Sequence, residues 1–242
     1  MLPLREVNAM LDIHSHFLPK IDDGSESVEM SLEMLRASKA QGVTTIVSTS
    51  HFYGNHVDPE TFLRHRNHAY KKLLPYLDDS VPEIFLGAEV LYFPGIAHSE
   101  EVRRLAIEGT NLILIEMPFF KWSERILDEI VSLQYGSGLN VILAHVERYR
   151  SIQKKNIYNM LFDLPVYFQC NAEAFSDRKS RKLAFNLIDN DMLHFLGSDC
   201  HNTTVRPPNM NTARSAIEQN YSAHEWNRLT NDFEARFNEH KI

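Results

Sequence analysis

The sequence predicts an α/β fold in which parallel strands form a closed or nearly closed barrel. Short runs rich in Val, Ile, Leu and Phe alternate with helical segments along all 242 residues. Several runs lack the apolar–polar alternation of a sheet with one solvated face, which is typical of buried parallel strands. Seven β-α units of this kind suit a barrel better than an open doubly wound sheet. No linker or repeat divides the chain, so we expect a single domain over residues 1–242.

The elements follow one another in a regular order. The expected strands cover residues 10–14, 44–48, 84–88, 112–116, 141–144, 166–170 and 193–196. Between them, apolar residues recur at helical spacing from Val28, and Gly42 is a suitable stop. Asp58 caps a second helix that starts with a proline, and Ser123 can cap a third. A capping box at residues 222–225 opens a helix near the C-terminus.

Charge and composition argue against several classes of partner. The formal net charge is −7, which disfavours nucleic acid or an anionic membrane as the main partner. No apolar stretch approaches the roughly 20 residues that cross a bilayer, and the start of the chain lacks the apolar core of a signal peptide. Cys170 and Cys200 provide no disulfide framework, so we expect a cytoplasmic protein without stable membrane insertion.

Metal-binding side chains stand at or just past the carboxyl ends of six of the seven expected strands. His14 and His16 end the first strand, and side chains two apart on an extended chain point to the same face. Asp199 and His201 repeat that spacing after the last strand. The strands between supply His51, Glu89, Glu116 and His145. Each residue alone is more often an ordinary loop residue, but six equivalent strand ends together predict a metal centre where α/β barrels build their active sites.

The charge of this cluster supports bound cations. The loop after the first strand offers Asp23 as a further ligand, although one of its two adjacent aspartates is expected to form an Asx turn. Asp23, Glu89, Glu116 and Asp199 would place four carboxylates in one pocket, which is repulsive without cations. Three divalent ions would leave that pocket with a charge of about +2. Mixed His and carboxylate ligands suit Mn, Zn or Fe, and the lack of thiolates argues against structural zinc.

Two arginines indicate a phosphate substrate. Arg148 and Arg206 follow ligand-type residues closely, and a guanidinium matches two phosphate oxygens at once. Each is as often a simple surface residue. A hydroxide bridging the ions would attack phosphorus in line while the arginines stabilise the other oxygens. Aromatic residues that can stack on a tyrosyl ring lie nearby: Phe52, Tyr53, Phe119, Phe120 and Tyr149.

Seven segments, in order along nearly the whole chain, carry a family pattern. They are His14-x-His16, Ile21-Asp22-Asp23-Gly24, Ser50-His51, Gly87-x-Glu89, Ile115-Glu116, Ala144-His145-Val146-Glu147-Arg148-Tyr149 and Gly197-Ser198-Asp199-Cys200-His201. These segments resemble the polymerase and histidinol phosphatase (PHP) superfamily, and more closely its CpsB/CapB branch of manganese-dependent bacterial protein-tyrosine phosphatases. The resemblance implies a distorted (βα)7 TIM-like barrel and three metal ions, with manganese expected and Fe, Zn or Mg as alternatives.

The resemblance also implies roles for individual residues. His14, His16, Glu89 and Asp199 would hold one ion, Glu89, Glu116 and His145 a second, and Asp23, His51 and His201 a third. Arg148 and Arg206 would clamp the phosphate, and either Asp199 or a metal-bound water could donate a proton. The implied substrate is phosphotyrosine on the tail of a bacterial tyrosine kinase that controls capsule or exopolysaccharide synthesis. Homo-oligomers occur among relatives, but the extension before the first strand leaves this open.

Three alternatives stay open. The chain could instead be a phosphatase of the same fold that hydrolyses a small phosphate ester such as histidinol phosphate. A non-catalytic module could bind a phosphorylated tail. Finally, Cys200 and Arg206 have the Cys-x5-Arg spacing of thiol-dependent tyrosine phosphatases, in which a thiolate attacks phosphorus. The loop lacks the glycine that such a cradle usually needs, which disfavours this third alternative.

Overall fold

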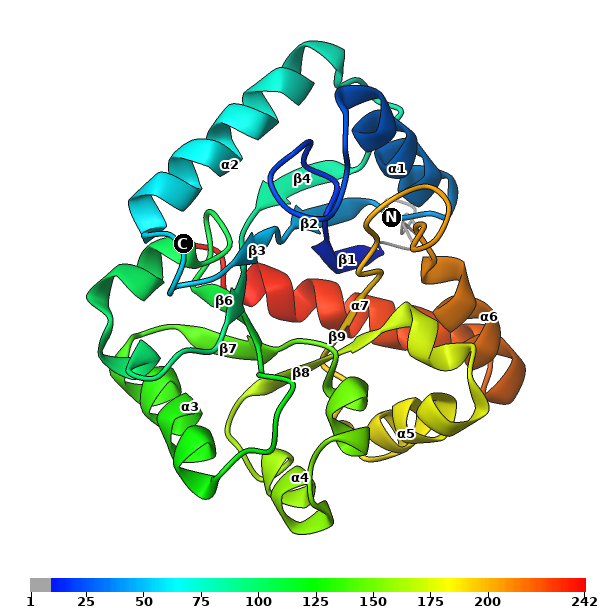
Figure 1. Cartoon of the computed structure of the whole chain (residues 1–242). Helices are drawn as coiled ribbons and strands as arrows, with labels where there is room; N and C mark the ends of the chain where they lie inside the picture. Colours follow the sequence, from blue (N-terminus) through cyan, green and yellow to red (C-terminus); the bar gives the residue numbers. More distant parts are fainter. Residues whose placement is uncertain (1–9) are drawn as a thin grey trace.

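The computed structural model describes residues 10–242 and has strands in the middle with helices around them (Figure 1). The strands are β1 (Leu11–Ser15), β2 (Thr45–Ser48), β3 (His51–Phe52), β4 (Glu83–Leu86), β5 (Glu89–Leu91), β6 (Leu112–Glu116), β7 (Asn140–Leu143), β8 (Tyr167–Asn171) and β9 (Phe195–Gly197). The α-helices are α1 (Val28–Ala40), α2 (Pro59–Leu73), α3 (Glu124–Gly136), α4 (Lys155–Leu161), α5 (Arg178–Asp189), α6 (Met210–Asn220) and α7 (Ala223–Glu239). The extension before the first expected strand lies outside the described residues.

All strand pairs are parallel, and together they form a curled, distorted barrel. The strand orders are β1-β2-β4 and β3-β5-β6-β7-β8-β9. Backbone hydrogen bonds then join the first strand to the segment after the last one. The Asp199 amide donates to the His14 carbonyl at 2.8 Å, and the His16 amide donates to the Cys200 carbonyl at 2.9 Å. This seam brings the two ends of the strand series together, which confirms the expected barrel-like α/β fold.

The expected strands at residues 44–48 and 84–88 each continue after a short break. Thr49 and Ser50 separate β2 from β3, while Gly87 and Ala88 separate β4 from β5. The breaks redirect the chain, so the first halves, β2 and β4, pair with each other and join β1 through β2, whereas the second halves, β3 and β5, pair with each other and join β6 through β5. The sequence analysis missed β3 and β5 as strands because two or three residues are too few for a periodic pattern. These short pieces nevertheless carry His51 and Glu89 into the site.

The helices begin largely where the sequence predicts. Asp58 accepts the Thr61 amide at the start of α2, and Ser222 accepts the Glu225 amide at the start of α7. Ser123 is the N-cap residue of α3, as predicted, but its side chain makes no capping hydrogen bond. No helix within residues 10–242 combines the length and the apolar character needed to span a membrane.

The C-terminal helix closes the barrel end opposite the carboxyl ends of the strands. His240, just after α7, contacts Asn140 at the start of β7 and Tyr167 at the start of β8. The strands themselves are buried along nearly their whole length, as in β6, where all five residues are buried. The barrel is therefore filled by apolar side chains and sealed at one end, and only the carboxyl ends of the strands remain for a site.

Candidate functional site

The predicted ligand residues meet at the carboxyl ends of the strands. His14 and His16 lie with their Nε2 atoms 3.1 Å apart. Glu89 Oε2 lies 3.2 Å from His14 Nε2 and 3.3 Å from His16 Nε2. Asp199 Oδ1 lies 3.5 Å from both of those nitrogens. All four side chains are almost fully buried. Residues separated by most of the chain therefore form one compact group of nitrogen and oxygen donors.

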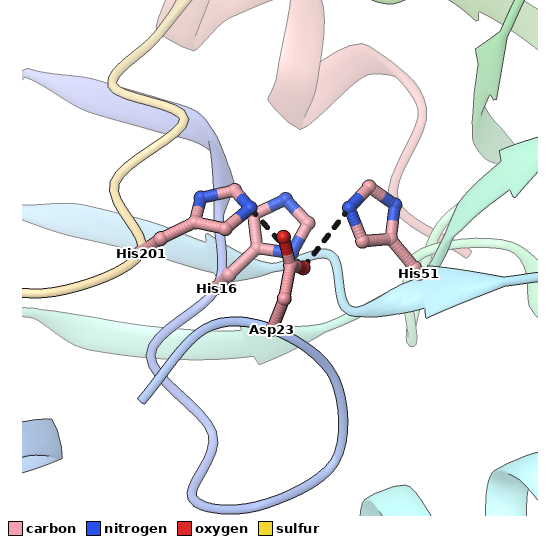
Figure 2. Close-up of side chains that lie close together, drawn as sticks. All are labelled: His16, Asp23, His51 and His201. Atoms are coloured by element: carbon pink, nitrogen blue, oxygen red, sulfur yellow. Dashed lines mark ion pairs between the residues drawn. The ribbon is translucent and has the colours of Figure 1, made fainter. Parts of the chain in front are cut away.

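A second group surrounds Asp23 at the edge of the first. Asp23 Oδ1 lies 3.4 Å from His51 Nε2 and 3.5 Å from His201 Nε2. Figure 2 shows His16, His51 and His201 gathered around this carboxylate, which reaches in from the loop after β1. Asp23 is 66% exposed whereas His201 is only 2% exposed, so this group opens to solvent on one side.

A third group forms on the other side of Glu89. His145 Nε2 lies 2.9 Å from Glu89 Oε1 and 3.4 Å from Glu116 Oε1. Glu89 Oε2 also lies 3.0 Å from His51 Nδ1, so the Glu89 carboxylate contacts imidazoles from all three groups. The structure thus brings together every side chain that the sequence analysis selected as a metal ligand.

Local backbone geometry turns these side chains inward. His145 and Asp199 have φ values of 33° and 52°, a left-handed conformation that is uncommon for residues other than glycine. Gly197 is needed beside them because a Cβ atom there would lie 2.5 Å from the His14 Cβ. Gly24 is needed under the loop because its Cβ would lie 2.2 Å from the His16 carbonyl oxygen. Strained backbone and close packing of this kind are typical of functional sites.

Hydrogen bonds orient three of the imidazoles. His14 Nδ1 faces Gln169 Oε1 at 3.1 Å, and His16 Nδ1 faces Asp22 Oδ2 at 2.9 Å. His201 Nδ1 faces the Asp199 carbonyl at 3.0 Å. Each Nδ1 faces an oxygen acceptor, so the Nε2 atom is the nitrogen turned into the cluster, where a metal ion can bind it.

Two polar residues of β8 complete this outer layer, and the sequence analysis missed both. Gln169 Oε1 also accepts the His145 amide at 2.8 Å, and Gln169 Nε2 donates to Asn171 Oδ1 at 2.8 Å. Asn171 Nδ2 in turn donates to Asp199 Oδ2 at 2.9 Å. The one expected strand without a ligand therefore positions three candidate ligands. The available signal was a pair of polar residues two apart in an otherwise apolar strand.

The two aspartates of the loop after β1 have different positions. Asp22 Oδ1 accepts the Gly24 amide at 3.0 Å and so forms the expected Asx turn, while Asp22 Oδ2 also accepts the His51 amide at 3.0 Å. Burial opposes the charged carboxylate of Asp22, yet the hydrogen bond and charge of His16 and the Gly24 amide lower its pKa to about 2. Asp23, by contrast, points its carboxylate into the cluster.

The electrostatics of the cluster match a cation site. Burial opposes the charged imidazole, yet the Asp22 hydrogen bond and Glu89 raise the pKa of His16 to about 10. Burial likewise opposes a charged His145, but Glu116 and Glu89 raise its pKa to about 9. Among residues 10–242, Glu89 Oε2 and His201 Nε2 are buried without a hydrogen-bond partner. Buried polar atoms are seldom left unpaired, so this donor set fits divalent metal ions.

A pocket of about 530 Å³ opens above the cluster. Arg148 and Arg206 line it, and each places a guanidinium nitrogen on Asp199 Oδ2, at 2.6 and 2.7 Å. The aromatic wall consists of Tyr53, Phe119 and Phe120. The other two aromatic residues considered from the sequence, Phe52 and Tyr149, are buried in the core instead.

Cys200 lies outside this pocket. Its side chain is 1% exposed, and burial raises the pKa of the Cys200 thiol far above its ordinary value. A thiol nucleophile needs a lowered pKa and access to substrate. The structure thus disfavours the Cys-x5-Arg alternative.

Comparison with known proteins places the chain in a family. The family described as "Capsular polysaccharide synthesis, CpsB/CapC" matches residues 10–236. Tyrosine-protein phosphatase CpsB of Streptococcus pneumoniae is 31% identical over 228 residues, which cover 88% of this chain and 92% of the relative. Tyrosine-protein phosphatase YwqE of Bacillus subtilis (strain 168) is 27% identical over 88% of this chain and 86% of the relative.

Solved structures agree on the fold. A structure from a study of YwqE from Bacillus subtilis and CpsB from Streptococcus pneumoniae, described as metal-dependent tyrosine phosphatases, superposes with a TM-score of 0.79 and 24% identity over 96% of both chains. A phosphotriesterase homology protein from Escherichia coli has a TM-score of 0.56 and 11% identity, covering 96% of this chain and 99% of that one. The chain therefore belongs to the CpsB/CapC family of capsular polysaccharide synthesis proteins.

Proposed function

We propose that this chain is a metal-dependent protein-tyrosine phosphatase that acts in capsule or exopolysaccharide synthesis. The observation that carries the proposal is the juxtaposition of a buried His–carboxylate cluster with two arginines at the floor of an aromatic-walled pocket. The names of the relatives favour phosphotyrosine over a small ester such as histidinol phosphate. We also propose that the chain forms a single domain and works in the cytoplasm, which suits its two free cysteines.

Three divalent ions, with manganese preferred, would occupy the three groups of side chains around Glu89. His14, His16 and Asp199 would complete the first set, Glu116 and His145 the second, and Asp23, His51 and His201 the third. When bound, such ions lower the pKa of water and neutralise charge on the phosphate. Two observations support this assignment: the short distances between the donor atoms, and the absence of a hydrogen-bond partner for the buried Glu89 Oε2 within residues 10–242.

The chain's own residues would bind and orient the phosphate. Arg148 and Arg206 converge on the same carboxylate oxygen of Asp199, so their guanidinium groups already point to one place in the pocket. A phosphate there would accept hydrogen bonds from both, which fixes its orientation and stabilises charge that develops during transfer. Burial opposes the charged carboxylate of Asp199, yet His14, Arg148 and His16 lower its pKa, which suits a ligand. A role for Asp199 as proton donor stays a prediction.

The substrate we propose is a phosphotyrosyl protein, namely the tail of a bacterial tyrosine kinase. Phe119 and Phe120 are 51% and 57% exposed at the pocket, an uncommon position for phenylalanine that suits stacking against a tyrosyl ring. We also propose that the chain can assemble into a homo-oligomer.

Kinetics with and without metal test this function. Manganese-loaded protein should hydrolyse a phosphotyrosyl peptide with a much higher kcat/KM than histidinol phosphate, and chelator-treated protein should be inactive until manganese is restored. His14→Ala should abolish turnover and lower manganese content, whereas Arg206→Ala should reduce turnover about 100-fold and keep the metal. Full activity of metal-free protein, or a preference for histidinol phosphate, would overturn the proposal.

A further inference from the structure

Two grooves lie on either side of helix α4. One, of about 510 Å³, lies between α4 and α5 and is lined by Arg150, Lys155 and Lys182. The other, also about 510 Å³, lies between the start of α3 and α4, and Lys121, Arg125 and Lys154 line it. Figure 1 shows α4 between α3 and α5, so these two grooves, here called the basic grooves, flank the same short helix.

Gln153 connects the basic grooves to each other and to the active site. It lines both grooves, and it forms hydrogen bonds with the loop that contains Phe120 of the pocket wall. Gln153 Nε2 donates to the Phe120 carbonyl at 2.7 Å, and Gln153 Oε1 accepts the Trp122 amide at 2.9 Å. Arg150 belongs to the same 3-10 helix, η4 (Val146–Ser151), as Arg148 of the pocket. The grooves and the pocket are therefore lined by neighbouring residues of the same two chain segments, which Gln153 holds together.

The basic grooves carry an excess of positive charge. Their six cationic side chains are all exposed, and none of them forms an ion pair with a carboxylate among residues 10–242. Within the described part of the chain, Glu124 is the single acidic residue that lines either groove. The chain as a whole carries a net charge of −7, so an excess of cations along these grooves differs from the charge of the whole chain. Such a segregated patch attracts polyanions and steers their approach.

We infer that the basic grooves bind an acidic segment of the phosphoprotein substrate, next to the phosphotyrosine held in the pocket. This inference rests on the proposed phosphatase function and adds a specificity determinant to it. An extended polypeptide can enter two grooves that flank one helix, whereas a flat lipid surface would touch only their rims. Acidic side chains of such a segment would pair with the six cations, which have no partner in the described chain.

Two phosphotyrosyl peptides that differ only in flanking Glu or Gln residues provide the test, with para-nitrophenyl phosphate as a substrate that reaches only the pocket. The variant is Lys155→Glu/Lys182→Glu, and the matched control is Lys71→Glu/Lys72→Glu, two exposed lysines of α2. At low salt the wild type should prefer the Glu peptide about tenfold in kcat/KM, and salt should reduce that preference. The groove variant should lose the preference and keep turnover of para-nitrophenyl phosphate, while the control keeps both.

Other outcomes would overturn the inference. If the wild type hydrolyses both peptides with equal kcat/KM, the basic grooves do not bind an acidic segment of the substrate, and the phosphatase function is unaffected. Retained preference in the groove variant would lead to the same conclusion. Binding to phosphatidylserine vesicles that the groove variant loses, without any peptide preference, would assign the surface to a lipid instead. Absence of hydrolysis of both peptides and of para-nitrophenyl phosphate would remove the phosphatase function and this inference together.

Discussion

Gln169 offers the sharpest test of how the site is assembled. Gln169→Met keeps the side-chain volume but removes the acceptor shared by His14 Nδ1 and the His145 amide, and the donor to Asn171. Gln169 is completely buried, so water cannot replace these bonds. A buried group left without its partner costs about 1–3 kcal/mol, so three such groups should lower the free energy of unfolding by roughly 3–6 kcal/mol after relaxation.

Metal affinity should fall as well. Without its acceptor, the His14 ring is free to change tautomer and orientation, and loss of such an outer hydrogen bond typically weakens metal binding about 10–100-fold. Calorimetric titration with manganese and thermal unfolding of the same preparations would measure both effects. Gln169→Glu keeps an acceptor oxygen for His14 and should retain more of the affinity than Gln169→Met.

A matched control is Gln153→Met. Gln153 is also a buried glutamine with backbone partners, but none of its hydrogen bonds reaches a candidate ligand among residues 10–242. It should lose stability yet bind manganese within about twofold of the wild type, because only outer hydrogen bonds to ligands tune the metal. If folded Gln169→Met protein bound manganese as tightly as the wild type, the positioning role assigned to β8 would be refuted.

Three further predictions follow from single residues. Cys200→Ser should keep near-wild-type kcat/KM on a phosphotyrosyl peptide, and complete loss would contradict metal-dependent catalysis without a thiol. Gly197→Ala should lower both the Tm and the manganese content, because its Cβ would collide with His14, whereas Gly136→Ala meets no atom within 4 Å and should leave both unchanged in the same assays. Burial lowers the pKa of His194 to about 4, below the unfolded value of about 6.5, so the folded state binds fewer protons between these values. The free energy of unfolding should therefore fall by roughly 3 kcal/mol as the pH drops from about 6.5 to 4, and denaturant titrations of His194→Gln should lack this component; identical pH profiles would refute it.

Much of the site was predictable because strand geometry is regular. Side chains two apart on a strand share a face, so the spacing of His14 and His16 alone was enough to pair them. Parallel strands present their carboxyl ends at one end of a barrel, so Glu116 and His145 could be expected to meet although 28 positions of sequence lie between them. The structure places both pairs as that reasoning requires.

The remainder depended on features that leave little trace in sequence. Gln169 and Asn171 were missed because the sequence does not show which atoms the polar side chains of a buried strand will hydrogen-bond. The left-handed backbone at His145 and Asp199 was equally hidden, since residues with side chains seldom adopt it and tertiary contacts impose it here. Ser123 matched the residue type of an N-cap, but residue type alone does not fix the rotamer that capping needs.

The seam between β1 and the segment after β9 has a consequence for folding during synthesis on the ribosome. The Ser198 amide donates to Asp12 Oδ1 at 2.8 Å, across 186 positions of sequence. At 5–20 residues per second, synthesis of that stretch takes roughly 10–40 s, during which the nascent first strand has no neighbour on its open side. Contacts that close so long a loop form late. A chain released by the ribosome before Gly197 would have its helices through α5 but neither Asp199 nor His201, so ribosomes that stop early would yield no partly active enzyme.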